Sequence, residues 1–141
     1  MKVRRARFEE LDGATLYAIL RLRSEVFVVE QTCPYLDPDG RDPEAEHWWI
    51  DDAGVIASYL RVIPEADGVS RIGRVVTSPS NRGCGLATDL MRAVLDTVDP
   101  PWRLDAQTPL VGWYEQFGFV VSGAEYLEDG IPHTPMARAM R

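Results

Sequence analysis

Residues 81–87, with the sequence Asn-Arg-Gly-Cys-Gly-Leu-Ala, have the types and spacing of a turn that holds phosphate. They follow an apolar, β-branched run and open a stretch with helical spacing. Glycine accepts positive φ angles and lets the backbone approach a ligand closely. The free N–H groups of a first helical turn, with the positive end of the helix dipole, attract an anion. The turn therefore predicts recognition of a phosphate-bearing ligand, with the Arg82 guanidinium as a further donor.

Residues 81–88 do not have the full pattern of either of two common phosphate-binding turns. A Walker A turn requires a lysine after its second glycine, and the only lysine of the chain is Lys2, so this class is excluded. A dinucleotide-binding turn requires G-x-G-x-x-G, which Gly83 and Gly85 match but Thr88 does not. Asp105 lies about 20 residues further on, where a ribose-binding acid is expected. Because no repeated strand–helix–strand units surround the turn, a nucleotide-binding protein stays only as an alternative.

The elements that position this turn follow from apolar periodicity, glycines and prolines. Strands are expected over 3–8, 47–51, 55–63, 70–78, 103–107, 119–126 and 134–139, and helices over 13–28, 84–98 and 110–117. An antiparallel meander thus leads into a strand–helix–strand crossover. The order predicts a mixed α/β sheet with helices packed on it, α+β in the stricter vocabulary, in one domain spanning 1–141.

Composition excludes several classes of protein. The net charge of −7 argues against general nucleic-acid binding, which needs a basic face. No apolar run approaches the roughly 18 residues of a membrane span, and no signal-peptide pattern opens the chain. Cys33 and Cys84 make no disulfide framework, which favours a reduced, cytoplasmic chain. No His, Cys and Asp residues have metal-ligand spacing, so no metal is expected.

A third phosphate-binding pattern, Arg/Gln-x-x-Gly-x-Gly/Ala, is matched by Arg82, Gly85 and Ala87. In these residues the chain resembles the GNAT family of N-acetyltransferases, whose pyrophosphate loop for acetyl-CoA has this pattern. The preceding segment is similar to the family's Val-x-Pro-x-x-Arg-Gly, with Thr77 at the valine position. Residues 114–119 are similar to a second family motif, Tyr-x-x-x-Gly-Phe.

Other segments resemble the ElaA-like branch of this family. They are residues 26–31, 33–35, 39–40, 47 and 128–133. With the loop, the resemblance covers nearly the whole chain. It implies a GNAT-type sheet that is mixed and mostly antiparallel, with helices on both faces and a splayed central strand pair. Acceptors in this branch are poorly defined, so the resemblance leaves the acceptor open.

The resemblance implies acetyl-CoA as cofactor and two segments that hold it. Backbone N–H groups of the loop would bind the pyrophosphate, at Arg82, Gly83, Cys84, Gly85, Leu86, Ala87 and Thr88. The strand end at Val75, Val76 and Thr77 would pair with pantetheine like an added strand. A bulge there would offer an N–H to the thioester oxygen. The alternative is an ordinary glycine-rich helix start. Cys84 is interpreted as serving packing or as tolerated at the turn, since direct attack by an amine needs no acyl-enzyme.

Acetyl transfer requires that the amine lose a proton and that the departing thiolate gain one. Tyr114 is the candidate acid, because a phenol of pKa about 10 can protonate a thiolate. Glu30, His47 and His133 are the candidate bases, and histidine exchanges protons most readily near neutral pH. Each has a structural alternative: core aromatic for Tyr114, helix-end charge for Glu30, strand residue for His47, and loop residue for His133. A water chain could replace a single base.

Residues 37–52 carry seven acids interrupted by Arg41, namely Asp37, Asp39, Asp42, Glu44, Glu46, Asp51 and Asp52. This loop is expected either to attract a cationic acceptor or to be solvated. The predicted function is direct acetyl transfer to a primary amine, on a small molecule or a peptide, in a ternary complex. A CoA-binding sensor or interaction module without turnover is the alternative. No nucleic acid or membrane partner is expected, and a homodimer paired through the C-terminal strands stays open.

Overall fold

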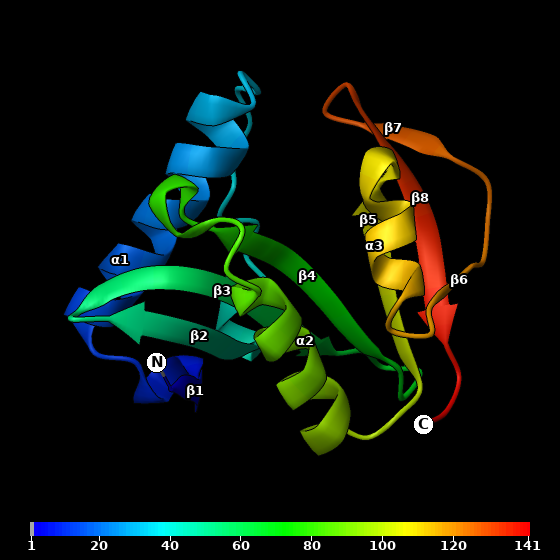
Figure 1. Cartoon of the computed structure of the whole chain (residues 1–141), viewed down its shortest axis with the longest axis horizontal. Helices are drawn as coiled ribbons and strands as arrows, with labels where there is room; N and C mark the ends of the chain where they lie inside the picture. Colours follow the sequence, from blue (N-terminus) through cyan, green and yellow to red (C-terminus); the bar gives the residue numbers. More distant parts are fainter. Residues whose placement is uncertain (1) are drawn as a thin grey trace.

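The structure, a computed structural model, describes residues 2–141 and places eight strands in one sheet (Figure 1). The strands are β1 (Val3–Arg7), β2 (Glu46–Asp52), β3 (Val55–Pro64), β4 (Ser70–Thr77), β5 (Trp102–Gln107), β6 (Val120–Val121), β7 (Tyr126–Glu128) and β8 (Ile131–Arg138). Their order is β1-β2-β3-β4-β5-β8-β6, and β7 also pairs with β8. Every pairing is antiparallel except that of β4 with β5. The predicted mixed sheet is confirmed.

The helices begin and end close to the predicted positions. They are α1 (Gly13–Arg23), the π-helical η2 (Ser24–Glu30), α2 (Leu86–Thr97) and α3 (Val111–Glu115), with 3-10 turns η1 (Phe8–Glu10), η3 (Asp42–Glu44), η4 (Pro79–Asn81) and η5 (Thr108–Leu110). Asp12 caps α1 by accepting a 2.7 Å hydrogen bond from the Thr15 backbone N–H. Among residues 2–141, no helix has the length and apolarity needed to cross a membrane.

Helices cover both faces of the sheet because neighbouring strand residues point to opposite faces. Trp48 on β2 belongs to a core cluster that contains the buried face of α2 and the aromatic residues around α3. Trp49, the next residue, belongs to a second cluster built on α1 and η2. We call these clusters the α2-side core and the α1-side core. The two faces therefore have separate cores.

Strands β4 and β5 lie side by side only at their beginnings (Figure 1). Their register includes Ser70 with Trp102 and Arg71 with Arg103, and no later pair. Beyond Arg71 the two strands diverge, while β5 stays paired with β8 along its length. The edge of β4 that faces β5 therefore has no strand partner over most of its length.

The predicted strand over 119–126 is instead two short strands, β6 and β7, on the outer edge of β8. Val121 pairs with Met136 and Tyr126 pairs with His133, with a gap between them. Pro135 lies in this gap. Its carbonyl oxygen accepts from the Ser122 backbone N–H at 2.9 Å, but it has no N–H to donate in return. The ladder is therefore interrupted at Pro135.

The turn between β2 and β3 generates a prediction about stability. Ala53 and Gly54 both have positive φ, 51° and 82°. A two-residue hairpin turn of this kind favours Asn-Gly, because an L-alanine in the left-handed region costs roughly 1–2 kcal/mol. Ala53→Asn should therefore raise the free energy of unfolding in urea, by up to about 1 kcal/mol. Ala53→Val should lower it, and a destabilised Asn variant would contradict this account.

Candidate active site

The divergence of β4 and β5 opens a cleft of about 720 Å³. One wall is β4 with the end of η2, and the other is β5 with the start of β8 and the turn that precedes it. The cleft reaches from Arg82, beside the start of α2, to His133 on β8. The structure thus brings three of the four predicted catalytic residues, Tyr114, Glu30 and His133, to one space, together with Arg82 from the predicted loop.

The loop before α2 has the backbone geometry of an anion site. Gly83 and Gly85 have φ of 80° and 76°, which other residues rarely adopt. Gly85 is the N-cap of α2, and no side chain caps the helix. The first N–H groups of α2, at Leu86, Ala87 and Thr88, are thus available to a ligand. Leu86 itself points its side chain into the α2-side core.

The strand end predicted to hold pantetheine lies along the cleft. Val75, Val76 and Thr77 all line it, and all lie on β4 beyond the last residue paired with β5. Their register with β3 is offset, since Tyr59 pairs with Val76 whereas Arg61 pairs with Gly73. The offset is a bulge in β4, at the place where the resemblance implies one.

Arg82 and Glu30 form a two-point ion pair at the cleft. Both guanidinium Nη atoms donate to the Glu30 carboxylate at 2.8 Å. The hydrogen bonds from Arg82 lower the pKa of Glu30. The Glu30 carboxylate is therefore held ionised, with both oxygens accepting hydrogen bonds from Arg82, and this weakens it as a proton acceptor.

Tyr114 lies at the cleft with only 6% of its surface exposed. Its ring packs edge-on against Trp113, with centroids 4.8 Å apart. Burial raises the pKa of the phenol. Tyr114 is therefore held in the protonated form, as a proton donor requires.

His133 lines the cleft with one ring nitrogen engaged. Its Nδ1 lies 2.8 Å from the Ile131 carbonyl oxygen, which only accepts, so Nδ1 carries the hydrogen. In the neutral ring, Nε2 then carries the lone pair. The ring stacks on Tyr126 with centroids 5.9 Å apart, which fixes its plane. Of the three predicted bases, His133 combines access to the cleft with a free acceptor nitrogen.

His47 does not lie at the cleft, and we remove it from the candidate bases. It is completely buried on β2. Its Nε2 donates to the Asp42 carbonyl oxygen at 3.0 Å, and its Nδ1 accepts from the Tyr59 hydroxyl at 2.6 Å. Both ring nitrogens are therefore used inside the protein, and the structural alternative describes this residue.

Comparison with known proteins identifies the family to which the chain belongs. A family model described as an acetyltransferase (GNAT) domain matches residues 25–140. The chain belongs to the GNAT acetyltransferase family. It is 47% identical to the UPF0039 protein Rv2851c of Mycobacterium tuberculosis, covering 96% of this chain and 92% of that one.

Two solved structures are similar over almost the whole GNAT chain. The crystal structure of an acyl-CoA N-acyltransferase from Pseudomonas aeruginosa has a TM-score of 0.91 and 40% identity, covering 99% of this chain and 100% of that one. Escherichia coli ElaA has a TM-score of 0.90 and 38% identity, covering 97% and 98%. The GNAT fold, the ElaA-like branch and the N-acyltransferase class are thus confirmed.

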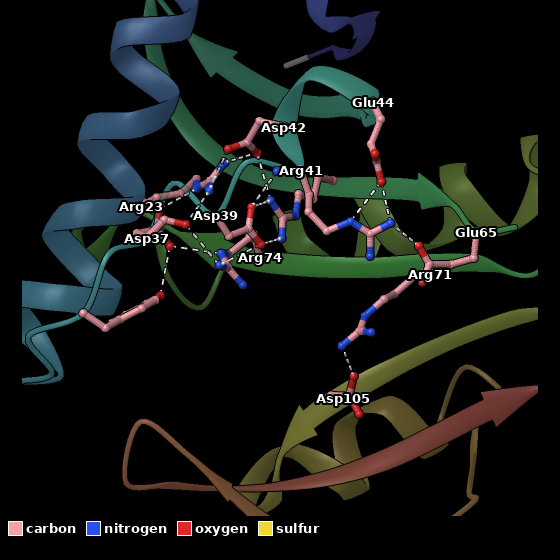
Figure 2. Close-up of polar contacts among 12 residues, drawn as sticks. Arg23, Asp37, Asp39, Arg41, Asp42, Glu44, Glu65, Arg71, Arg74 and Asp105 are labelled. Atoms are coloured by element: carbon pink, nitrogen blue, oxygen red, sulfur yellow. Dashed lines mark hydrogen bonds and ion pairs between the residues drawn. The ribbon is translucent and has the colours of Figure 1, made fainter.

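The acidic loop of this GNAT chain is partly neutralised internally, which corrects both expectations for Asp37 and Asp42. Asp37, Asp39 and Asp42 contact Arg23, Arg61 and Arg74, and we call these six residues the ion cluster (Figure 2). Asp37 is 2% exposed and Arg23 is fully buried. Asp37 and Asp42 therefore neither face a cationic acceptor nor lie in solvent, whereas Asp39 pairs with Arg61 and Arg74 but stays exposed at the cleft.

Motif reasoning missed the ion cluster, although the sequence contains a sign of it. Arg23 ends an amphipathic helix and Arg61 interrupts the apolar run of β3. A charged residue within an apolar element requires a partner. The aspartates of loop 37–42 are the carboxylates in the sequence that could pair with these two arginines.

The buried histidine generates a prediction about pH. Burial lowers the pKa of His47 below its ordinary value. Below about pH 6.5 the His47 side chain binds a proton in the unfolded chain but not in the folded one. His47 therefore contributes to the free energy of unfolding above that pH, and this contribution is lost as the pH falls. Urea unfolding should show decreasing stability from pH 7 towards pH 5, and His47→Gln should flatten this slope.

His133→Gln is the matched control, because it removes the other histidine and leaves His47 in place. It should retain the slope of the original protein. An unchanged slope in His47→Gln would assign the titration to another group.

Proposed function

We propose that this N-acyltransferase uses acetyl-CoA and transfers the acetyl group to a primary amine by direct attack in a ternary complex. The observation that carries the proposal is the continuous cleft between β4 and β5. It leads from Arg82, beside the uncapped start of α2, to Tyr114 and to His133, whose Nδ1 is engaged by the Ile131 carbonyl oxygen. The acceptor is an amine on a small molecule or a peptide.

Coenzyme A would be held mainly by backbone groups. The N–H groups at the start of α2 receive the pyrophosphate, with Arg82 shared between Glu30 and the phosphate oxygens. Pantetheine lies along the unpartnered edge of β4 and pairs with it like an added strand. The bulge then lies beside the thioester, and its N–H groups can polarise the carbonyl.

Two side chains move the protons in this proposal. His133 Nε2 takes a proton from the acceptor ammonium, directly or through water, which frees the amine lone pair. The amine nitrogen bonds to the thioester carbon, and the carbon–sulfur bond breaks. Tyr114 gives its hydroxyl proton to the departing thiolate. The second proton that the nitrogen must lose once the carbon–nitrogen bond has formed passes through water and restores the Tyr114 hydroxyl. The products are the N-acetylated amine and CoA.

Cofactor binding is the first test of this proposal. A ligand that binds only the folded state stabilises it by about 2.7 kcal/mol at a hundredfold excess over Kd. Acetyl-CoA and CoA should each raise the melting temperature. Gly85→Val should abolish the shift, because a β-branched residue resists a φ of 76°.

NAD and ATP serve as comparison ligands in the same titration. No shift with millimolar CoA or acetyl-CoA, or a larger shift with NAD or ATP, would overturn the cofactor assignment. The melting temperature of ligand-free Gly85→Val must be measured alongside, so that loss of binding is separated from loss of folding.

Turnover across an amine panel tests the proton transfers. Removal of a general acid typically costs 10²–10⁴-fold. Tyr114→Phe should lower kcat by roughly that range while CoA affinity is retained. Tyr17→Phe on the exposed face of α1 is the matched control and should leave kcat unchanged. CoA binding without turnover of any amine would favour the sensor instead.

A further inference from the structure

We propose that Arg74 is a positioning residue that holds the β4 bulge in its catalytic shape through the ion cluster. The proposal rests on the proposed function, because it concerns the N–H groups that face the thioester. Arg74 touches neither reacting atom in this account. It acts through the conformation of its own backbone.

The bulge consists of Arg74 and Val75. Tyr59 pairs with Val76 and Arg61 pairs with Gly73, so Leu60 alone lies opposite these two residues. Arg74 has a φ of 52°, in the left-handed region that a residue with a Cβ seldom occupies. Such a conformation persists only where surrounding contacts enforce it.

The two faces of the sheet show what the bulge does to Arg74. In a regular strand, residues two apart share a face, so Arg74 would share the face of Ile72. Ile72 is buried in the α2-side core, where a guanidinium would have no partner. Instead Val75 packs against that core, and Val76 belongs to the α1-side core. The bulge thus turns Arg74 towards the α1 side, where the ion cluster lies.

The contacts of Arg74 are with residues of the ion cluster, above all the buried Asp37 (Figure 2). Its Nε lies 2.9 Å from a carboxylate oxygen of Asp37, and its Nη2 donates to the Asp37 carbonyl at 3.1 Å. The Asp37 carboxylate is also bound by Arg23 Nε at 2.8 Å and by the Tyr35 hydroxyl at 2.9 Å. Asp39 lies 3.4 Å from Arg74 Nη2. Arg74 is therefore tied to a buried carboxylate that cannot follow it if the strand straightens.

The unfavourable backbone and the ion pairs therefore require each other. Without the guanidinium, a residue with a Cβ gains nothing from the left-handed conformation, and the strand can relax towards regular geometry. The N–H groups of the bulge would then point elsewhere. Because small displacements of positioning groups can cost about 10²-fold in rate, this relaxation should appear in kcat.

A pair of substitutions separates the backbone role from the side-chain role. Arg74→Ala removes the ion pairs and keeps the Cβ, so kcat should fall about tenfold or more, corresponding to about 1.4 kcal/mol. Arg74→Gly removes the same ion pairs but accepts the positive φ. Its kcat should be at least threefold higher than that of Arg74→Ala, with the KM for acetyl-CoA similar in both. Equal losses in the two variants would overturn the proposal, and so would no loss in either.

Ala53→Gly is the matched control for backbone relief. Ala53 has nearly the same φ, 51°, but lies in the β2–β3 turn away from the cleft. This change should leave kcat unchanged. If Arg74→Ala fails to fold, Arg74→Lys serves in its place, since a single ammonium cannot reproduce the contacts of two guanidinium nitrogens.

A second measurement is independent of turnover. Backbone NMR shifts of Gly73, Val75 and Val76 report the bulge conformation, and they should stay close to the original values in Arg74→Gly and move in Arg74→Ala. Shifts that move equally in both variants would overturn the role of Arg74. If the original protein acetylates no amine, the proposed function fails while these shifts still decide the role of Arg74.

Discussion

The ion cluster is the interaction on which the geometry of the cleft depends. Asp37 and Asp39 come from the irregular segment after η2 and Asp42 begins η3, whereas the arginines of the cluster come from α1, β3 and β4. Removing one partner of a buried ion pair typically costs about 3–5 kcal/mol, because the remaining charge is left uncompensated. The segment that follows η2 is therefore held to α1, β3 and β4 by ion pairs. Asp39, Arg61 and Arg74 of the ion cluster also line the cleft.

The divergence of β4 from β5 provides the other half of the site. A parallel pair held only at its start leaves the backbone groups on the β5-facing edge of β4 without strand partners, and such groups require hydrogen bonds from elsewhere. The α2-side core keeps the two arms joined, since β4 and β5 both contribute to it through Ile72 and Leu104. The protein thus combines an open sheet edge with a closed core beneath it.

Local features of the site could be predicted from the sequence, whereas contacts between distant segments could not. The loop around Gly85 and the helix after it depend on neighbouring residues, and both were found where the pattern places them. The bond between Arg74 and the Asp37 carbonyl joins residues 37 positions apart, so no periodicity reveals it. His47 was proposed for its chemistry, but its burial follows from the packing of η3 and β3 around it.

The interrupted outer edge of β8 limits how another chain could pair with this sheet by adding a strand. An unpaired sheet edge is a template for another chain, and its hazard grows with the length of the free ladder. Here Pro135 divides the outer layer into β6 and β7, which offer two and three residues. A second sheet can find only short stretches to extend at this edge. The interruption at Pro135 thus limits the length of strand that another chain could add at this edge, where the side chains of Val120 and Leu127 are exposed.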